Sequence, residues 1–226
     1  MAFMAPKDSA LKEKTILYSE GKVKERKFVR DGKLEGEYFA YYQSGQILSH
    51  LHFENGKRNG PAFIYYPDGH IKEKAKFVND RLEGEYTSFF ENGNVREKEF
   101  YRHGRLEGLY QIYFKIGQLK MEERFRKGRF DGEYTCYYKN GQIKEKGLFK
   151  NDKREGEYCT YFKSGELKEK AVFKNGKLIG EFLVFTENSS RTQATDSEED
   201  GSAPVWEEHE VASLLQELQH FDKKQK

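Results

Sequence analysis

Glycine recurs in this chain at a fixed interval of 24 residues, and this interval limits the folds that the chain can adopt. One series comprises Gly36, Gly60, Gly84, Gly108, Gly132, Gly156 and Gly180. A second series with the same spacing comprises Gly21, Gly45, Gly69, Gly93, Gly117, Gly141 and Gly165. A period of about 20–50 residues is typical of repeat proteins, in which each repeat is one small structural unit. The sequence therefore predicts seven copies of a 24-residue unit.

Each unit contains two turn signals that lie about a dozen residues apart. The first turn is marked by pairs such as Ser44-Gly45, Asp68-Gly69, Asn92-Gly93 and Asn140-Gly141. The second turn is marked by pairs such as Asp31-Gly32, Asn55-Gly56, Asn79-Asp80 and Asn175-Gly176. We expect two-residue hairpin turns at both places, because Asn and Gly tolerate the positive φ that such turns require. The fold class that follows is an all-β repeat protein, an elongated single-layer antiparallel meander of about 14 strands.

Strand alternation assigns the residues of each unit to two faces of the sheet. Pairing across Asn140-Gly141 places Tyr138 opposite Ile143, Cys136 opposite Glu145, Tyr134 opposite Gly147, and Gly132 opposite Phe149. The face that carries these residues collects the aromatic and aliphatic side chains of all units, among them Tyr38, Tyr86, Tyr110, Tyr134, Tyr158, Phe53, Phe77, Tyr101, Phe125, Phe149, Phe173, Ile47, Ile71, Val95, Leu119, Ile143 and Leu167. We attribute the repeating glycine to packing, since a ring on the opposite strand would lie on its backbone.

The other face is charged and carries pairs of basic residues, here called the Lys/Arg ladder: Lys72, Lys74, Arg96, Lys98, Lys144, Lys146, Lys168 and Lys170. Aromatic residues, among them Tyr65, Tyr113, Tyr137 and Tyr161, are expected opposite the first base of each pair. The Glu between two bases points to the aromatic face, so we expect that it neutralises nothing on the ladder. A further basic residue follows each second turn, at Lys33, Lys57, Arg81, Arg105, Arg129, Lys153 and Lys177.

The Lys/Arg ladder allows two interpretations. A basic stripe with interleaved tyrosines suits anionic lipid headgroups, a nucleic acid or an acidic protein. Alternatively, the ladder is a solvated sheet face whose charges are balanced by acids near the repeating glycine, such as Glu155 and Glu157. The ladder and its tyrosines are therefore candidate binding residues.

The pattern Gly-Glu-Tyr-x-x-Tyr-Tyr-x-x-Gly-x-Ile-Lys-x-Lys-x-x-Phe-x-Asn-Gly-Lys-x-x-Gly resembles the variant MORN repeat of bacterial proteins labelled YwqK-type antitoxins. The resemblance covers residues 16 to 185 or so. It implies an elongated β-meander used for protein or lipid contacts, and it transfers no site residue. Two units depart from the pattern, one with Leu48 and His50 and another with Met121 and Glu122, so a basic stripe would be interrupted there.

The two ends of the chain differ from the repeats. We divide the chain into an N-terminal extension (1–15), the MORN-like repeat sheet (16–186), an acidic flexible linker (187–205) and a short C-terminal amphipathic helix (206–226). Val211, Leu214, Leu215 and Leu218 form one apolar stripe of that helix. Because a lone short helix is marginal in water, we expect it to dock on the chain's own sheet or on a partner.

Charge and composition limit the classes of protein and the cellular locations that we expect for this chain. Residues 187–226 hold ten acids and four bases, whereas the rest holds 36 bases and 28 acids. Cys136 and Cys159 are too few for a disulfide framework. We interpret them as structural residues that pack on opposite faces of the sheet. We see no secretory signal, so we expect a cytoplasmic protein, with peripheral membrane association or export to a host as alternatives.

The sequence contains little that suggests enzymatic chemistry. His50 and His52 fall on one face and could hold a metal, but no third ligand is evident nearby, so we interpret them as a surface pair. We expect no catalytic residue, no cofactor and no metal. Paired acids recur in most units, and a recurring feature is more often structural than catalytic.

We therefore predict a non-enzymatic binding or scaffold protein that uses its sheet for protein–protein contacts, in an antitoxin-type or effector role. The alternative is a membrane-surface adaptor that binds anionic phospholipid through the Lys/Arg ladder. A protein partner or a self-dimer is expected because the aromatic face would otherwise meet water. We expect neither a nucleic acid partner nor a small-molecule substrate.

Overall fold

The computed structural model describes residues 10–187 and 192–193, and all of these belong to one compact unit of the chain. The described part contains strands, turns and bends, and no helix. The predicted helix over 206–226 lies outside the described residues, as does most of the predicted linker.

The strands form one 19-stranded sheet. Their bounds are β1 Lys12–Leu17, β2 Val23–Arg30, β3 Lys33–Tyr41, β4 Ile47–Glu54, β5 Lys57–Tyr65, β6 Ile71–Val78, β7 Arg81–Leu82, β8 Gly84–Phe89, β9 Val95–Arg102, β10 Arg105–Leu106, β11 Gly108–Tyr113, β12 Leu119–Arg126, β13 Arg129–Tyr137, β14 Ile143–Lys150, β15 Lys153–Tyr161, β16 Leu167–Lys174, β17 Lys177–Leu178, β18 Leu183–Val184 and β19 Thr192–Gln193.

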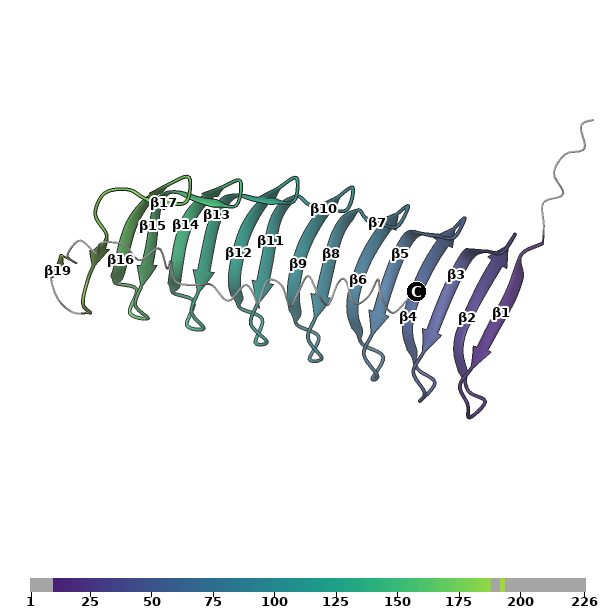
Figure 1. Cartoon of the computed structure of the whole chain (residues 1–226). Coiled ribbons are helices and arrows are strands. Elements are labelled where there is room, and N and C mark those ends of the chain that lie inside the picture. The colour runs from purple at the N-terminus through teal and green to yellow at the C-terminus, as the bar shows by residue number, and fades with distance from the viewer. Residues whose placement is uncertain (1–9, 188–191, 194–226) are drawn as a thin grey trace, which may run out of the picture. The chain divides into compact units, whose positions relative to one another are not determined.

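Every pairing in the sheet is antiparallel, and the strands follow one another in chain order (Figure 1). The predicted fold class, an all-β antiparallel meander in a single layer, is confirmed. Three of the expected strands are each split into a short and a longer part, namely β7 and β8, β10 and β11, and β17 and β18.

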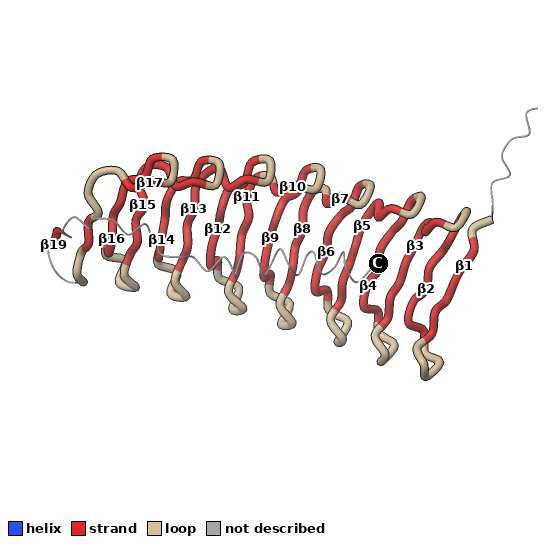
Figure 2. Tube along the Cα trace, viewed as in Figure 1, coloured by secondary structure: helices blue, strands red, loops and turns tan. Residues whose placement is uncertain are grey.

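The second turn of each unit has the predicted two-residue form. Asn151 and Asp152 have φ of 50° and 67°, and Asn55 and Gly56 have φ of 51° and 82°. Both central residues therefore lie in the left-handed region that a type I′ turn requires. These turns form the upper edge of the sheet in Figure 2.

The first turn differs from the prediction. The amide of Gly141 donates to the carbonyl of Tyr138, and the amide of Tyr138 donates to the carbonyl of Gln142. Only the glycine has positive φ there, 85° at Gly141. The loop thus has three residues, a type I turn followed by a left-handed glycine. As a result Tyr137, not Tyr138, pairs with Ile143.

The repeating glycine also has a different role from the one expected. Its cross-strand partners are as predicted, for example Gly132 opposite Phe149 and Gly156 opposite Phe173. However, a Cβ added at Gly156 would meet nothing within 4 Å, and φ at Gly156 is 75°. On the other side of β15 the register shifts between Gly147 and Leu148. At Gly156 glycine is thus needed for the left-handed backbone of a β-bulge. At Gly132 space is limiting as well, because an added Cβ would lie 2.7 Å from the Cβ of Arg124.

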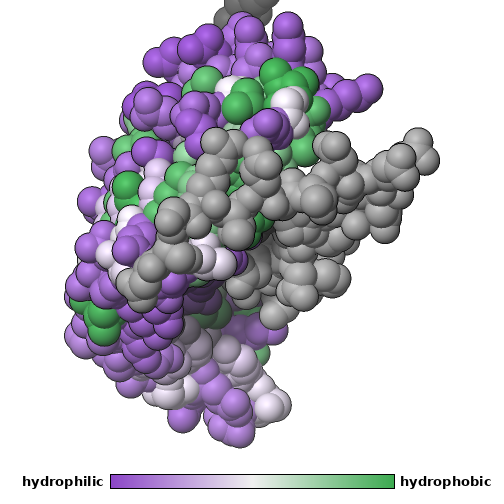
Figure 3. Space-filling model, turned by 90° about the vertical axis from the view of Figure 1, so that its left-hand side faces the viewer, coloured by the Kyte–Doolittle hydropathy of each residue, from purple (hydrophilic) through white to green (hydrophobic). Residues whose placement is uncertain are grey.

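These bulges bend the sheet, and the aromatic face lies inside the bend. Tyr38 and Phe53 are only 6% and 7% exposed although the described residues form a single layer. Tyrosines of this face meet a ring on the following long strand edge-on, as Tyr134 meets Phe149 at 6.0 Å between ring centroids. We call this side the inner face and the opposite side the outer face. Viewed along the row of strands, the bowed outer surface is mostly hydrophilic (Figure 3).

Hydrogen bonds between neighbouring units fix the spacing of the hairpins. At the first turns, the Tyr42 hydroxyl donates to the carbonyl of Tyr65 at 2.7 Å, and Tyr138 repeats this bond to Tyr161 at 2.8 Å. At the second turns, a carboxylate accepts the backbone N–H of the next unit's turn, as Glu155 does from Asn175. Acids beside the repeating glycine therefore have a structural task.

We predict that Gly156→Ala lowers the free energy of unfolding by about 1–2 kcal/mol, because an L-residue in the left-handed region is strained. Gly156→Asn should lose less, since Asn tolerates this region better. Urea titration measures both. A larger loss for Asn than for Ala would support a packing role and contradict the backbone explanation.

Candidate binding surface

The structure divides the Lys/Arg ladder into two sets. The first base of each pair forms an ion pair with the neighbouring glutamate of the inner face. The shortest contact joins Lys144 Nζ to Glu145 Oε1 at 3.1 Å, and Arg96 Nε lies 3.2 Å from Glu97 Oε1. Lys72 and Lys168 repeat the contact with Glu73 and Glu169 at 3.8 and 3.4 Å. The expectation that these glutamates neutralise nothing on the ladder is therefore wrong. The bulge beside the first turn changes the alternation that the expectation assumed.

The second base of each pair remains on the outer face and has varied surroundings. Lys170 forms an ion pair with Glu157 at 2.6 Å. Lys74 and Lys146 lie 5.8 and 5.5 Å from the ring centroids of Phe89 and Tyr161, within range of a cation–π contact. Within the described part of the chain, no ion pair involves Lys98.

The predicted tyrosines stand near the first turns, each opposite an aliphatic residue and not opposite the first base. Tyr65 pairs with Ile71, and Tyr161 pairs with Leu167. Tyr113 donates to the Gln111 side chain at 3.0 Å. The ladder is interrupted at Glu122, as the sequence indicates, and Gln111 and Tyr137 both donate to this carboxylate.

The outer face is hollowed over β8, β9, β11 and β12, where a groove of about 730 Å³ lies. Phe100 and Leu109 line it and are 38% and 39% exposed, while Thr87 at its floor is 4% exposed. A volume of this size is in the range of ligand and peptide sites. Four basic residues stand around the apolar centre, namely Lys74, Lys98, Arg124 and Arg126, together with the acids Glu85, Glu107 and Asp131.

Sequence reasoning missed this groove, although one signal was available. In each of the other units, the position of Leu109 holds Glu or Pro, namely Glu37, Pro61, Glu85, Glu133, Glu157 and Glu181. Leu109 therefore replaces a charge by an exposed apolar side chain. In the same unit, Ile116 is 65% exposed at a turn position that holds Ser, Asp, Asn or Glu in the other units. The groove lies where the repeat is least regular.

Buried carboxyl groups lie on the inner face behind the groove. Glu99 is 7% exposed, and burial raises its pKa to about 7, although a hydrogen bond from Tyr101 acts in the opposite direction. Burial likewise raises the pKa of Glu123 to about 7. The pKa of Glu97 is also raised by burial, in spite of Arg96 and a hydrogen bond from Ser88. Strand β9 thus presents Lys98 and Phe100 outward and carboxyl groups inward.

His50 and His52 share one acceptor. Both rings hydrogen-bond the Glu37 carboxylate, His52 at 2.9 Å. Burial alone would raise the pKa of Glu37, but these two hydrogen bonds outweigh it and lower the pKa. His50 also stacks on Phe39, with ring centroids 4.3 Å apart. Among the described residues, no group of three or more His, Cys, Asp or Glu could hold a metal ion.

The two cysteines occupy opposite faces, as expected. Cys136 pairs with Glu145 on the inner face, and Cys159 pairs with Lys146 and Lys170 on the outer face. Both are buried free thiols. In the part of the chain that the structure describes, there is no helix with the length and hydropathy needed to span a membrane.

The sequence matches the family model of the MORN repeat variant in five segments: residues 34–55, 58–79, 82–103, 130–151 and 154–175. Repeats of this type are generally implicated in binding proteins or membrane lipids. The unit that carries Leu109, Ile116 and Glu122 lies between the third and fourth matches. No curated protein matches the chain.

We predict that the protein loses stability as the pH rises from about 4.5 to about 7. Glu99 and Glu123 keep their protons in the folded chain up to about pH 7, whereas in the unfolded chain they ionise near 4.5. Below about pH 4.5 the two protonated carboxyl groups therefore make their full contribution to the stability of the folded chain. This contribution to stability is lost as the pH rises from about 4.5 to about 7.

Glu99→Gln should raise the free energy of unfolding at pH 8 by about 1–3 kcal/mol and change it little at pH 4. Urea titrations at the two pH values measure this difference. The control is Glu85→Gln on the outer face, which should change neither value. An equal effect of Glu99→Gln at both pH values would contradict the assignment.

Proposed function

From the premise that the chain is built of MORN repeat variant units, we propose that it is a non-enzymatic binding protein that holds a partner protein in the outer-face groove. The observation that supports this proposal is that two exposed apolar residues, Phe100 and Leu109, lie together in the hollow of a face that carries many charged residues. Exposed apolar side chains in a hollow with a polar rim are typical of contact sites.

The chemistry of the groove suggests what the partner presents. Phe100 and Leu109 suit one or two apolar side chains, which would lose water on binding. Lys98, Arg124 and Arg126 stand beside them, and within the described residues no ion pair involves these three. Arg and aromatic residues are enriched at the centres of protein interfaces. A partner segment with an apolar anchor and a neighbouring carboxylate fits this arrangement best.

The Lys/Arg ladder supports the membrane-lipid alternative less well. Half of its eight residues contact the inner-face glutamates, and Lys170 pairs with Glu157. Those charges are already balanced within the chain. Toxin neutralisation, which the YwqK-type resemblance implies, and a scaffold role would both use a protein contact. The identity of the partner distinguishes these two roles.

We predict that Leu109→Glu abolishes partner binding without loss of stability. The substitution installs the residue that the repeat carries at this position, so the fold should tolerate it, while a buried carboxylate in the groove would oppose an apolar anchor. The measurement is affinity capture from cell lysate on the immobilised full chain, followed by titration calorimetry with the purified partner.

The matched control is Leu148→Glu, which changes a 43% exposed leucine of the same face outside the groove. A stoichiometric partner retained by the wild type and by Leu148→Glu, but lost by Leu109→Glu, supports the proposal. If Leu109→Glu keeps the wild-type affinity, the groove is not the contact site. Unfolding curves of all three proteins verify that each is folded.

A further inference from the structure

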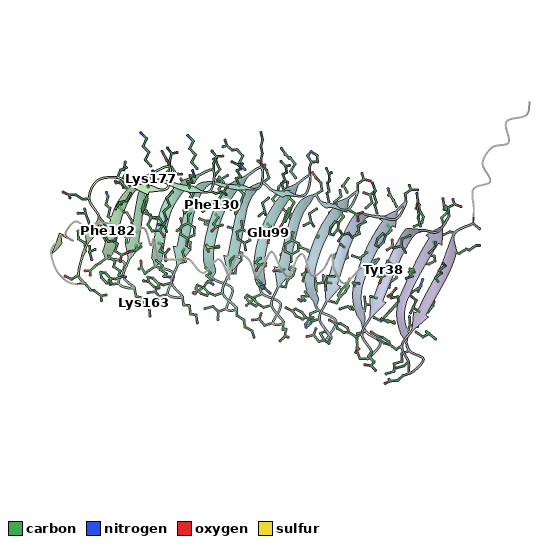
Figure 4. The ribbon with its side chains drawn as sticks, viewed as in Figure 1. Tyr38, Glu99, Phe130, Lys163, Lys177 and Phe182 are labelled. Carbon is green, nitrogen blue, oxygen red and sulfur yellow. The ribbon has the colours of Figure 1, made fainter. Side chains whose placement is uncertain are left out.

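The outer face carries a row of aromatic residues beside the first turns. Each of them is the last residue of its strand, at the ends of β3, β5, β8, β11, β13 and β15, and each is half-buried. We call these residues the ring row: Tyr41, Tyr65, Phe89, Tyr113, Tyr137 and Tyr161. The neighbouring first turns form the edge of the sheet on which Lys163 is labelled in Figure 4. An aromatic ring is thus presented at the same place in successive units.

Hydrogen bonds between units hold the ring row at a regular spacing. The hydroxyl group of Tyr18 donates to the backbone carbonyl of Tyr41 at 2.6 Å, and that of Tyr66 donates to the carbonyl of Phe89 at 2.7 Å. Each row residue also pairs across its hairpin with an aliphatic residue, as Tyr41 pairs with Ile47. The rings are therefore preorganised, which lowers the entropy lost when an extended ligand binds.

Packing within the sheet does not explain why every member of the row is aromatic. Two residues earlier on the same strands, the outer face holds Phe39, Phe63, Thr87, Gln111, Thr135 and Cys159. The face thus accepts small and polar residues directly beside the row. Ile47 and Ile71, which pair with the first two rings, are 37% and 38% exposed. The row and its partners form an apolar strip in contact with water, and such strips indicate a contact surface.

The spacing of the ring row matches one conformation of a protein chain. Consecutive rings are two strands apart in the sheet. Neighbouring strands lie about 4.7–4.9 Å apart, so the rings repeat about every 9.4–9.8 Å. A polyproline II helix has three residues per turn and rises about 3.1 Å per residue, so it repeats about every 9.3 Å. A segment with proline at every third residue therefore brings one proline to each ring as it crosses the strands.

We propose that the ring row binds a proline-rich segment of a partner protein in the polyproline II conformation, with one proline against each ring. The proposal rests on the proposed function, because it specifies the partner protein by one of its segments. The row also continues into the groove, which Phe89 lines. Proline-rich segments dock on aromatic residues in other binding domains, since their helix is preformed and loses little entropy. Its carbonyl groups make no internal hydrogen bonds and are available to tyrosine hydroxyls.

The basic residues beside the row indicate the charge of the segment. Lys74 and Lys146 lie 5.8 and 5.5 Å from the ring centroids of Phe89 and Tyr161. Within the part of the chain that the structure describes, no ion pair involves either lysine. A carboxylate between two prolines would meet these ammonium groups, so we expect an acidic segment. Glu122 takes the place of the lysine in one unit and opposes the contact there.

The test measures the binding of synthetic peptides to the full chain by titration calorimetry. The probe repeats Pro-Ala-Glu over about 18 residues, so that proline recurs once per turn of the helix. A permuted peptide has the same composition, but its prolines are irregularly spaced. A third peptide repeats Ala-Ala-Glu and carries the same charge without proline. We expect the wild type to bind the probe most tightly, and more weakly as salt is added.

The variant Tyr65→Leu with Tyr137→Leu leaves no more than two consecutive rings in the row. Leucine keeps an apolar contact with the paired residues Ile71 and Ile143. The matched control is Tyr65→Phe with Tyr137→Phe, which keeps both rings. The leucine variant should bind the probe about tenfold more weakly than the wild type, and the phenylalanine variant should stay within about threefold of it. Urea unfolding curves verify that both variants are folded.

Equal affinity of the wild type for the probe and the permuted peptide would overturn the proposal, because spacing would not matter. Equally tight binding of the Ala-Ala-Glu peptide would also overturn it, since charge alone would suffice. The same holds for equal losses in the leucine and phenylalanine variants, and for no probe binding by the wild type. Self-association that only the leucine variant loses, without probe binding, would assign the row to a second copy of the chain.

The ring row and the groove are tested by separate readouts. A cellular partner lost by Leu109→Glu, together with no binding of the probe by the wild type, would retain the groove and refute the ring row. Probe binding that depends on the two rings, without a partner lost by Leu109→Glu, would support the ring row and refute the groove alone.

Discussion

The structure depends on a bend that lets a single sheet bury its own aromatic face. A flat layer of hairpins would leave Tyr38, Tyr86 and Tyr134 in water, yet each is 6% exposed. The bend arises at the repeating glycine, where a left-handed residue and a register shift interrupt the strand. Bulges of this kind increase local bending and twist. Because every unit bends at the same position, inner side chains of neighbouring units pack together, as Tyr38, Phe53 and Phe77 do in one cluster. The left-handed backbone at the repeating glycines thus makes possible the burial of the inner-face rings.

The repeat period, the hairpins and most strand registers could be predicted from the sequence, because turn residues and alternation are local properties. Cys136 opposite Glu145 and Phe149 opposite Arg154 follow from counting outward from a turn. The errors came from bulges, which add residues to one strand without a distinct sequence signal. One extra residue beside the first turn moved Tyr137 opposite Ile143 and brought Lys144 to Glu145. Spacing alone could not separate a two-residue turn from a three-residue loop, since Asn-Gly suits both.

The candidate binding surface was predicted only in part, and for a related reason. The Lys/Arg ladder was inferred as eight equivalent bases, but the bulge places half of them against inner carboxylates. The groove could not be inferred from the repeat at all, because it depends on residues that depart from it. Leu109 is informative because the other units hold Glu or Pro there. In a repeat protein the consensus encodes the fold, and specific contacts arise where one unit differs.

The groove shows how such a sheet can acquire a surface function. It is a local departure, since one unit exchanges a glutamate for Leu109 and creates an apolar centre. Other units balance charges of the outer face within the chain, as Lys144 does with Glu145 and Lys170 does with Glu157. The irregular unit is therefore the place where a specific contact can arise without a change in the fold of the other units.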